Sequence, residues 1–288
     1  MKNLLTETKA ESLLGFIQRL EATGLSHAAA GHIARISIDL LSAISTRDPA
    51  GWAAQVPETL ELERRWYESL KAETPDYGIY SELAYVADVF ACWRIYSRGY
   101  LRAMWSEKSD PPIGVFGSMV GVHRIVDIGC GIGYTTSTLA QIFPGQQVYG
   151  VDLDDSLQGK IAANLSKEDG WTFRPNIQKV RAEVDGADLV FASEYFEHIQ
   201  RPIEHLHYIL GAFQPRYFIA ANAFSAIWTG HFNSYQYGAL TLDARATAKQ
   251  FALALKDAGY ERVKTKLWNG RPSFWRRAET TSHENQTS

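Results

Sequence analysis

Residues His123–Asp154 carry the pattern that most limits how this chain can fold. A short run over Ile125–Ile128 is largely apolar and β-branched, as in a buried strand. A second such run, Val148–Val151, ends directly before Asp152, and Tyr134–Phe143 between the two runs is typical of a helix. Two parallel strands joined by a helix form a βαβ unit, whose crossover is right-handed. The stretch therefore predicts a parallel sheet covered by helices.

Three glycines at alternate positions, Gly129, Gly131 and Gly133, follow the first predicted strand. A residue without a Cβ lets the backbone approach a ligand closely, and the helix behind it presents unpaired N–H groups. Asp152 lies 19 residues beyond Gly133, where a carboxylate can accept hydrogen bonds from both ribose hydroxyls of a nucleoside. The pattern predicts a nucleoside-containing cofactor; the alternative is a tight strand–helix turn that binds no ligand.

The glycine spacing distinguishes between cofactors. G-C-G-I-G is one residue shorter than the dinucleotide pattern G-x-G-x-x-G. Asp127 stands two positions before Gly129, and a carboxylate there would repel a pyrophosphate but suits a cationic or amino-bearing ligand. Both features disfavour a nicotinamide oxidoreductase.

The stretch VDIGCGIGYTT, followed by VDLD, closely resembles the first two motifs of class I S-adenosylmethionine-dependent methyltransferases. The resemblance covers roughly residues 123–277. It implies an α/β fold with a doubly wound, mostly parallel seven-stranded sheet that ends in an antiparallel hairpin, and S-adenosyl-L-methionine as the cofactor. The residues that it assigns to cofactor binding are Asp127, Gly129, Cys130, Gly131, Gly133, Asp152, Leu153, Glu183, Glu194 and Tyr195.

In this fold the adenine usually lies at a loop before the fourth strand. We expect a third strand over Asn176–Ala182 and a fourth over Ala187–Ala192, so the loop is Ala182–Asp185. Either Glu183 or Asp185 could accept from the exocyclic amine, and a solvated turn is the alternative for each.

The segment after the fourth strand, DLVFASEYFEHIQRPIEHL, resembles the corresponding motif of the same methyltransferases, in which Leu-Glu-His is common. Phe196 replaces the usual leucine here. The element lines the methionine end of the cofactor in that family. Glu197 and His198 are therefore candidates for proton transfer, although their commoner role is to hold the turn.

A fifth strand, Arg216–Ala221, is followed by a loop through Gly230–Tyr237 that leaves the same edge of the sheet as the glycine turn. Ligands of doubly wound sheets bind at this edge, and related methyltransferases often carry a His-Phe pair in this loop. His231 is the best candidate for a base, and a packing or capping histidine is the alternative. The further candidates are Asn222, Tyr235 and Trp228.

The N-terminal part has helical spacing and matches no family motif. We place a boundary at Ser109–Pro112, which divides the chain into a helical cap (1–110), a cofactor-binding domain (111–277) and a disordered tail (278–288). A long helix over Ser81–Trp105 carries several tyrosines and arginines. They either pack and form a solvated basic edge, or form a lid that reaches the cofactor or the substrate.

The composition narrows the class of protein. A net charge of −3 gives no global basic field for nucleic acid. The two cysteines, Cys92 and Cys130, lie in a predicted helix and in the glycine turn, so we expect no disulfide and a cytoplasmic protein. We expect neither a membrane span nor a signal peptide, and we find no histidines and carboxylates at a convincing metal-ligand spacing.

We therefore expect an enzyme (EC 2.1.1.-) that transfers a methyl group to an oxygen, nitrogen or carbon of a small molecule. The sulfonium is already activated, so positioning and desolvation can suffice and no catalytic residue is required by the pattern. The chain lacks the Asn/Asp-Pro-Pro-Tyr/Phe element after strand four that is typical of enzymes methylating bases of nucleic acid.

Several alternatives stay open. A nucleotide or nucleic-acid acceptor rests on a basic hairpin over residues 262–277, with a turn at Asn269-Gly270. A scaffold protein could keep the fold without turnover, and an enzyme could transfer another group, such as aminocarboxypropyl. No membrane partner is expected, and the oligomeric state is not predicted.

Overall fold

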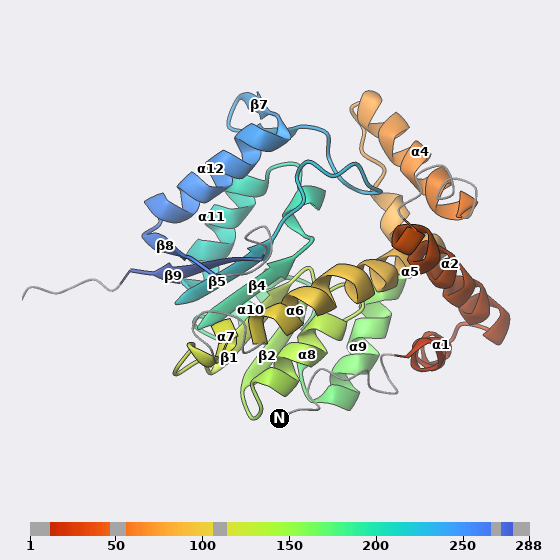
Figure 1. The fold of residues 1–288 in the computed structure, drawn as a ribbon, viewed down its shortest axis with the longest axis horizontal. Coiled ribbons are helices and arrows are strands. Elements are labelled where there is room, and N and C mark those ends of the chain that lie inside the picture. The colour runs from red at the N-terminus through yellow and green to blue at the C-terminus, as the bar shows by residue number, and fades with distance from the viewer. Residues whose placement is uncertain (1–11, 47–55, 106–113, 266–271, 279–288) are drawn as a thin grey trace, which may run out of the picture.

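The computed structural model describes residues 12–46, 56–105, 114–265 and 272–278. Its centre is a seven-stranded sheet in the order β3-β2-β1-β4-β5-β9-β8 (Figure 1). The pairs from β3 to β5 are parallel, whereas β9 runs antiparallel to both of its neighbours. This confirms the predicted sheet. The strands are β1 (Arg124–Ile128), β2 (Gln147–Val151), β3 (Thr172–Arg174), β4 (Leu189–Ser193), β5 (Tyr217–Ala221), β8 (Tyr260–Val263) and β9 (Ser273–Arg277).

Helices cover both faces of this sheet. Helices α8 (Tyr134–Ile142) and α9 (Leu157–Asp169) pack together on one face, below the sheet in Figure 1, and α11 (Pro202–Phe213) and α12 (Ala244–Asp257) pack together on the other. Ile125 and Val126 of β1 point to opposite faces, and both are fully buried. The nearly continuous, β-branched apolar runs predicted strands that are buried on both faces, and the structure agrees.

One predicted strand is wrong. Residues Asn176–Ala182, expected to form strand three, instead begin a short helix, α10 (Ile177–Arg181), and the third strand lies earlier at β3. The Asn176 side-chain oxygen accepts a 3.0 Å hydrogen bond from the Lys179 N–H, which caps the helix. The capping residue therefore decides the conformation of a segment whose apolar spacing also suits a strand.

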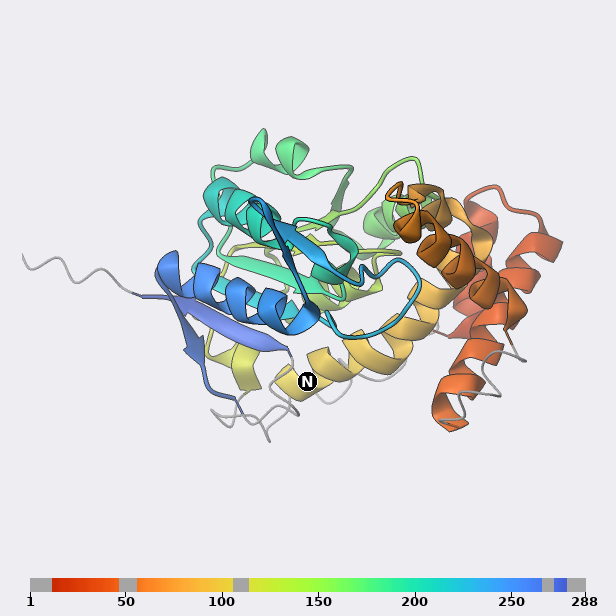
Figure 2. The ribbon, with the colours of Figure 1, turned by 90° about the horizontal axis from the view of Figure 1, so that it is seen from above.

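The N-terminal helices form a group at one side of the sheet, in red and orange in Figures 1 and 2. They are α1 (Leu13–Ala22), α2 (His27–Thr46), α4 (Pro57–Lys71), the 3-10 helix η2 (Tyr77–Ser81) and α5 (Leu83–Cys92). Helix α2 packs along α5, and α1 packs on α9 of the sheet layer. We call this group the cap.

The predicted helix over Ser81–Trp105 is present but is not uniform. Helix α5 is followed without a break by a π-helical turn, η3 (Trp93–Ser97), and then by α6 (Arg98–Trp105). A π turn contains more residues than an α turn and is frequent at functional sites. It therefore changes which side chains face the sheet beyond Cys92.

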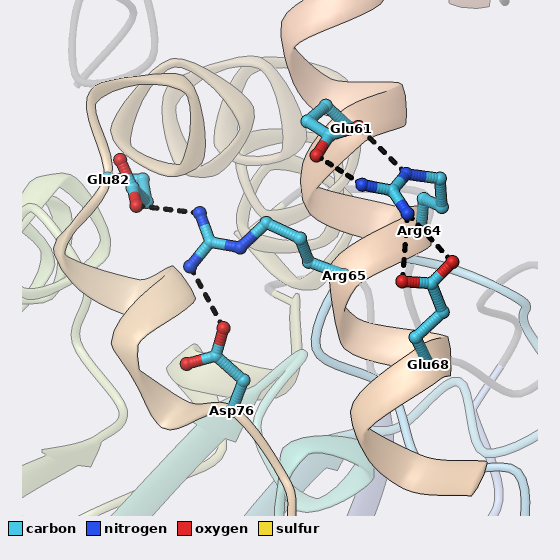
Figure 3. A network of polar contacts seen from close by, with 6 residues as sticks. All are labelled: Glu61, Arg64, Arg65, Glu68, Asp76 and Glu82. Atoms are coloured by element: carbon cyan, nitrogen blue, oxygen red, sulfur yellow. Dashed lines mark hydrogen bonds and ion pairs between the residues drawn. The ribbon is translucent and has the colours of Figure 1, made fainter. Parts of the chain in front are cut away.

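Ion pairs fasten α4 to the segment that follows it (Figure 3). Arg65 reaches out of its helix to Asp76 at 2.9 Å and to Glu82 at 2.8 Å, on the two sides of η2. The neighbouring Arg64 instead pairs with Glu61 and Glu68 of its own helix, each at 2.7 Å. Arg65 thus ties helix α4 to η2.

A small two-stranded sheet that the sequence did not predict follows β5, with strands β6 (Tyr235–Tyr237) and β7 (Leu240–Leu242). The proposed boundary at Ser109–Pro112, the turn at Asn269-Gly270 and all of the tail except Ala278 lie outside the described residues. Among the helices that are described, none combines the length and the apolar character that crossing a bilayer requires.

Candidate functional site

A cavity of about 690 Å³ lies between the cap and the ends of β1, β2, β4 and β5. The carboxyl ends of parallel strands are where ligands bind in this class of sheet. The cap, the glycine turn and the loops after β2, β4 and β5 all contribute. Residues on its wall include Tyr80, Tyr85, Asp88, Cys92, Trp93, Tyr96, Tyr100, Gly129, Cys130, Gly131, Asp152, Leu153, Gln178, Glu194, Tyr195, His198, Trp228 and His231.

The glycine turn requires glycine for both conformation and space. Gly129, Gly131 and Gly133 have φ of +72°, +56° and +88°, a region that other residues rarely adopt. A Cβ on Gly129 would lie 2.2 Å from the ring of Tyr195, and one on Gly131 would lie 3.0 Å from a methyl of Val89 on α5. The turn is therefore packed closely between the loop after β4 and the cap.

Asp152 ends β2 and presents its carboxylate beside the glycine turn. Its oxygens accept hydrogen bonds from Gly131 N–H at 2.7 Å, Leu153 N–H at 2.8 Å and the Gln158 amide at 3.0 Å. Burial raises its pKa to about 6, while these donors oppose the rise. The group is therefore ionised at neutral pH and can accept further hydrogen bonds from a ligand.

Glu194 and Tyr195 turn the chain sharply after β4. Glu194 has a φ of +51°, unusual for a residue other than glycine, and its N–H donates to the Ala221 carbonyl at 2.7 Å. Its carboxylate accepts a 3.3 Å hydrogen bond from the hydroxyl of Tyr100 on α6. The Tyr195 hydroxyl lies 2.9 Å from His205 Nε2. Strained backbone at a ligand edge is typical of functional sites.

Two histidines meet on the cavity wall. The rings of His198 and His231 pack edge to face with centroids 4.6 Å apart. Burial lowers the pKa of His231 to about 4, and burial together with His231 lowers that of His198 far below its usual value. His231 Nδ1 lies 3.0 Å from the Ala226 carbonyl, which can only accept. Nδ1 must therefore carry the proton, which leaves the Nε2 lone pair of a neutral imidazole.

The cap fixes the loop that carries His231. Trp66 of α4 donates its indole N–H to the His231 carbonyl at 2.6 Å. The Tyr67 hydroxyl donates to the Trp228 carbonyl at 3.3 Å and accepts from the Trp228 N–H at 3.1 Å. The Trp228 indole N–H in turn donates to Asp88 of α5 at 2.8 Å. The candidate base is thus positioned by residues more than a hundred positions away.

Three of the predicted cofactor residues, Asp127, Gly133 and Glu183, do not line the cavity. Gly133 instead faces the ring of Trp171, which would lie 2.7 Å from a Cβ at this position. Asp127 is 1% exposed and accepts a 2.7 Å hydrogen bond from the Thr136 hydroxyl inside the core, where burial raises its pKa to about 7. Glu183 forms an ion pair with Arg174 instead. The segment after β3 that reaches the cavity is 175–178, one turn before the predicted adenine loop.

Two of the predicted catalytic residues also lie off the cavity wall. Glu197 is fully buried and accepts a 2.8 Å hydrogen bond from the Ala223 N–H. Burial and the nearby Glu194 carboxylate raise its pKa well above the usual range. The buried Tyr235 hydroxyl donates to the Glu197 and Phe224 carbonyls, each at 3.4 Å. Both residues hold the loops. Asn222 is also absent from the wall.

The cap reaches the cavity with tyrosines, and none of its described arginines lines it. Asp88, which no sequence motif marks, is 5% exposed on that wall. Its one signal is that it is the only charged residue of the apolar helix LAYVADVFAC.

Both cysteines are free thiols and line the cavity. Among the described residues no cluster of three or more histidines, cysteines and carboxylates could hold a metal ion.

Comparison with known proteins agrees with this geometry. A family model described as a methyltransferase domain matches residues 126–216. A trans-aconitate 2-methyltransferase of Rhodopseudomonas palustris (strain BisA53) is 34% identical over 94 residues, which cover 32% of this chain and 35% of that protein. A malonyl-[acyl-carrier protein] O-methyltransferase of Legionella pneumophila is 30% identical over 80 residues, 26% of this chain and 27% of that protein.

The chain thus spans about a third of the length of the curated relatives it matches. Among solved structures, the mitomycin 7-O-methyltransferase MmcR aligns with 96% of this chain and 75% of its own, at 14% identity and a TM-score of 0.46. The segment matched by the family model extends from β1 to the residue before β5, and so contains the glycine turn, Asp152 and Glu194.

Proposed function

We propose, from the premise that residues 126–216 form a class I S-adenosylmethionine-dependent methyltransferase domain, that the whole chain is an enzyme that methylates a small molecule. The observation that carries the proposal is the cavity, in which the glycine turn and Asp152 face a wall built by the cap. The helical cap and the sheet domain would then be the acceptor side and the cofactor side of one site.

The residues of the cavity fit S-adenosylmethionine. The turn at Gly129–Gly133 leaves no room for side chains where backbone must approach a ligand. Asp152 offers a carboxylate for ribose hydroxyls, and Asn176–Gln178 flank it on the neighbouring loop. Glu194, at the end of β4, suits the positively charged methionine end. No lysine or arginine is among the described residues of the wall, so nothing there repels a sulfonium.

The cofactor, when bound, supplies a methyl group on a sulfonium, an activated electrophile with a neutral leaving group. The protein's own residues must align the acceptor and exclude water. The aromatic walls contributed by Tyr80, Tyr85 and Trp228 provide apolar surface for both tasks. The protein therefore does not have to ionise one of its own side chains for the methyl transfer itself.

His231 is our candidate for accepting the acceptor's proton. Its neutral imidazole directs the Nδ1 proton to the Ala226 carbonyl and leaves Nε2 as the acceptor atom. A His231→Gln variant should lower kcat by about 100-fold or more if the nucleophile loses a proton in the transition state. An unchanged kcat would mean that the acceptor is already deprotonated, and His231 would then be a packing residue.

The first test of the function is calorimetric binding of S-adenosylmethionine and S-adenosylhomocysteine. We expect both to bind the wild type, and Asp152→Ala to weaken them by about 10- to 100-fold, since charge-assisted hydrogen bonds are lost. Glu183→Ala is a matched control, because that carboxylate lies off the cavity. A folded wild type that binds neither compound would reject the proposal in favour of a scaffold role.

A nucleic-acid acceptor is less well supported. Arg262 and Arg276, two basic residues of the C-terminal hairpin, lie on β8 and β9, at the edge of the sheet opposite to β3. No basic residue in the described part of this hairpin lines the cavity. The free thiols Cys92 and Cys130 on its wall agree with a reducing compartment, and we propose a cytoplasmic enzyme on that ground.

A further inference from the structure

A buried carboxylate on the cap side of the cavity has no charge partner among the described residues. Asp88 is 5% exposed and lines the cavity. One of its oxygens accepts from the Trp228 indole N–H at 2.8 Å, and the other lies 3.8 Å from the Cys92 sulfur, a weak donor. Both partners are neutral, so neither balances a negative charge. A buried charge normally has a partner of opposite sign. Burial, with a smaller contribution from the Glu63 carboxylate, raises the pKa of Asp88 to about 7.

The rest of the wall also favours cations over anions. Three carboxylates line the cavity, those of Asp88, Asp152 and Glu194, and no lysine or arginine among the described residues does. Eight tyrosines and two tryptophans also contribute to the wall. Aromatic ring faces attract cations, and carboxylates attract them more strongly in a site shielded from water. A bound anion would find no described positive side chain to compensate the loss of its hydration.

Asp88 lies away from the proposed ribose site. It is fixed through Trp228 to the loop after β5, whereas Asp152 ends β2. Strands β1 and β4 separate β2 from β5 in the sheet. The two carboxylates are therefore held by different segments of the cavity wall, and Asp88 is fixed to the loop after β5 that also carries His231.

We propose that Asp88 binds a protonated amine on the acceptor, whose body is aromatic and packs against the tyrosine wall. The proposal rests on the proposed methyl transfer and names the class of its acceptor. It departs from the trans-aconitate in the names of three relatives, because a polycarboxylate would bring its negative charges against Asp88. The nitrogen serves recognition here, and the methylated atom is a separate question.

The test is calorimetry on the wild type saturated with S-adenosylhomocysteine, which allows acceptor binding without turnover. The probes are matched by ring and differ by one group: tyramine, tyrosol and 4-hydroxyphenylacetate, then tryptamine and indole-3-acetate, with trans-aconitate beside them. We expect each amine to bind at least about 10-fold more tightly than the matched carboxylate, and the alcohol to lie between them.

Asp88→Asn removes the charge but keeps an oxygen that can accept from Trp228. It should weaken amine binding by about 10-fold or more and leave the affinity for S-adenosylhomocysteine within about two-fold of the wild type. Asp257→Asn is the matched control, because it removes the same charge from an exposed position on α12 that does not line the cavity. This control should leave the affinity for both ligands unchanged.

Each other outcome overturns the proposal in a distinct way. Carboxylates or trans-aconitate that bind as tightly as the amines, or no binding by any probe, reject the acceptor class, and this comparison needs only the wild type. Amine binding that Asp88→Asn leaves unchanged makes Asp88 an anchor for Trp228. Loss of S-adenosylhomocysteine in Asp88→Asn assigns the residue to the cofactor. A wild type that binds no S-adenosylhomocysteine rejects the proposed function first.

Discussion

The indole N–H of Trp66 lies 2.6 Å from the carbonyl oxygen of His231, a residue 165 positions further along the chain. Trp66 is fully buried in the cap, and His231 is on the loop after β5. This hydrogen bond joins the two parts of the molecule directly behind the candidate base. The cap therefore positions a residue that it does not itself contain.

The Trp66–His231 bond predicts a selective effect of Trp66→Phe. The smaller ring keeps most of the aromatic packing with Phe232 but leaves the buried carbonyl of His231 without its donor. We expect a loss of about 2–3 kcal/mol of unfolding free energy, measured by urea denaturation. S-adenosylhomocysteine affinity should stay within about two-fold, because the glycine turn is not touched. A larger loss of cofactor affinity would show that the cap and the cofactor side are coupled through this bond.

A second prediction concerns the conformation of the glycine turn. Gly129→Ala would place a methyl group 2.2 Å from the Tyr195 ring at a φ of +72°, so we expect it to displace that ring and to abolish S-adenosylhomocysteine binding. Gly145→Ala is the matched control, since Gly145 has a φ of +78° but no atom within 4 Å of the added methyl. This variant should lower the free energy of unfolding by about 1–2 kcal/mol and leave the affinity for S-adenosylhomocysteine unchanged. Equal effects of the two variants on binding would contradict the packing argument.

The buried His231 makes stability sensitive to acid. Its pKa is about 4 in the folded chain, below the usual 6.5, so the unfolded chain binds the extra proton between these two values. Its contribution is complete above about pH 6.5 and is lost as the pH falls towards 4, by about 3 kcal/mol. We expect His231→Gln to flatten this acid decline in urea unfolding between pH 4.5 and 7.5. A decline as steep as that of the wild type would assign it to other groups.

Asp127 predicts a pH dependence of opposite sign. Burial raises its pKa from 3.8 to about 7, so the folded chain holds the proton that the unfolded chain releases. Stability falls as the pH rises from about 4 to 7, by about 4 kcal/mol from this group. Asp127→Asn keeps an acceptor for the Thr136 hydroxyl and should gain stability relative to the wild type as the pH rises. The measurement is thermal melting of both proteins at pH 5 and pH 8; a constant difference would reject the buried, protonated state.

The sheet was predictable from local patterns, whereas the set of residues that line the cavity was not. The β1–α8–β2 unit follows from apolar runs, the glycine spacing and Asp152, because these features act within about thirty residues. The predicted position of strand three was wrong because the capping hydrogen bond of Asn176 outweighed an apolar spacing that suits either a strand or a helix. Propensity alone does not include that bond.

Side-chain direction explains the errors at the site. Asp127 and Asp88 are both acidic residues in apolar segments, yet the first points into the core and the second into the cavity. The direction of Asp127 follows from its bond to Thr136, and that of Asp88 from Trp228, which is 140 positions away. Contacts between such distant segments are not encoded in a local motif, so the sequence pattern selected one carboxylate and missed the other.

Two stretches of chain that do not overlap supply much of the cavity wall. Residues 77–100, from η2 into α6, provide most of the aromatic surface, and residues 129–153 provide the turn and the carboxylate that we propose for the cofactor. Substitutions in the first stretch can alter which molecule is accepted while the second keeps the same donor. Enzymes with new acceptors could therefore arise, or be selected in the laboratory, from libraries confined to about two dozen codons.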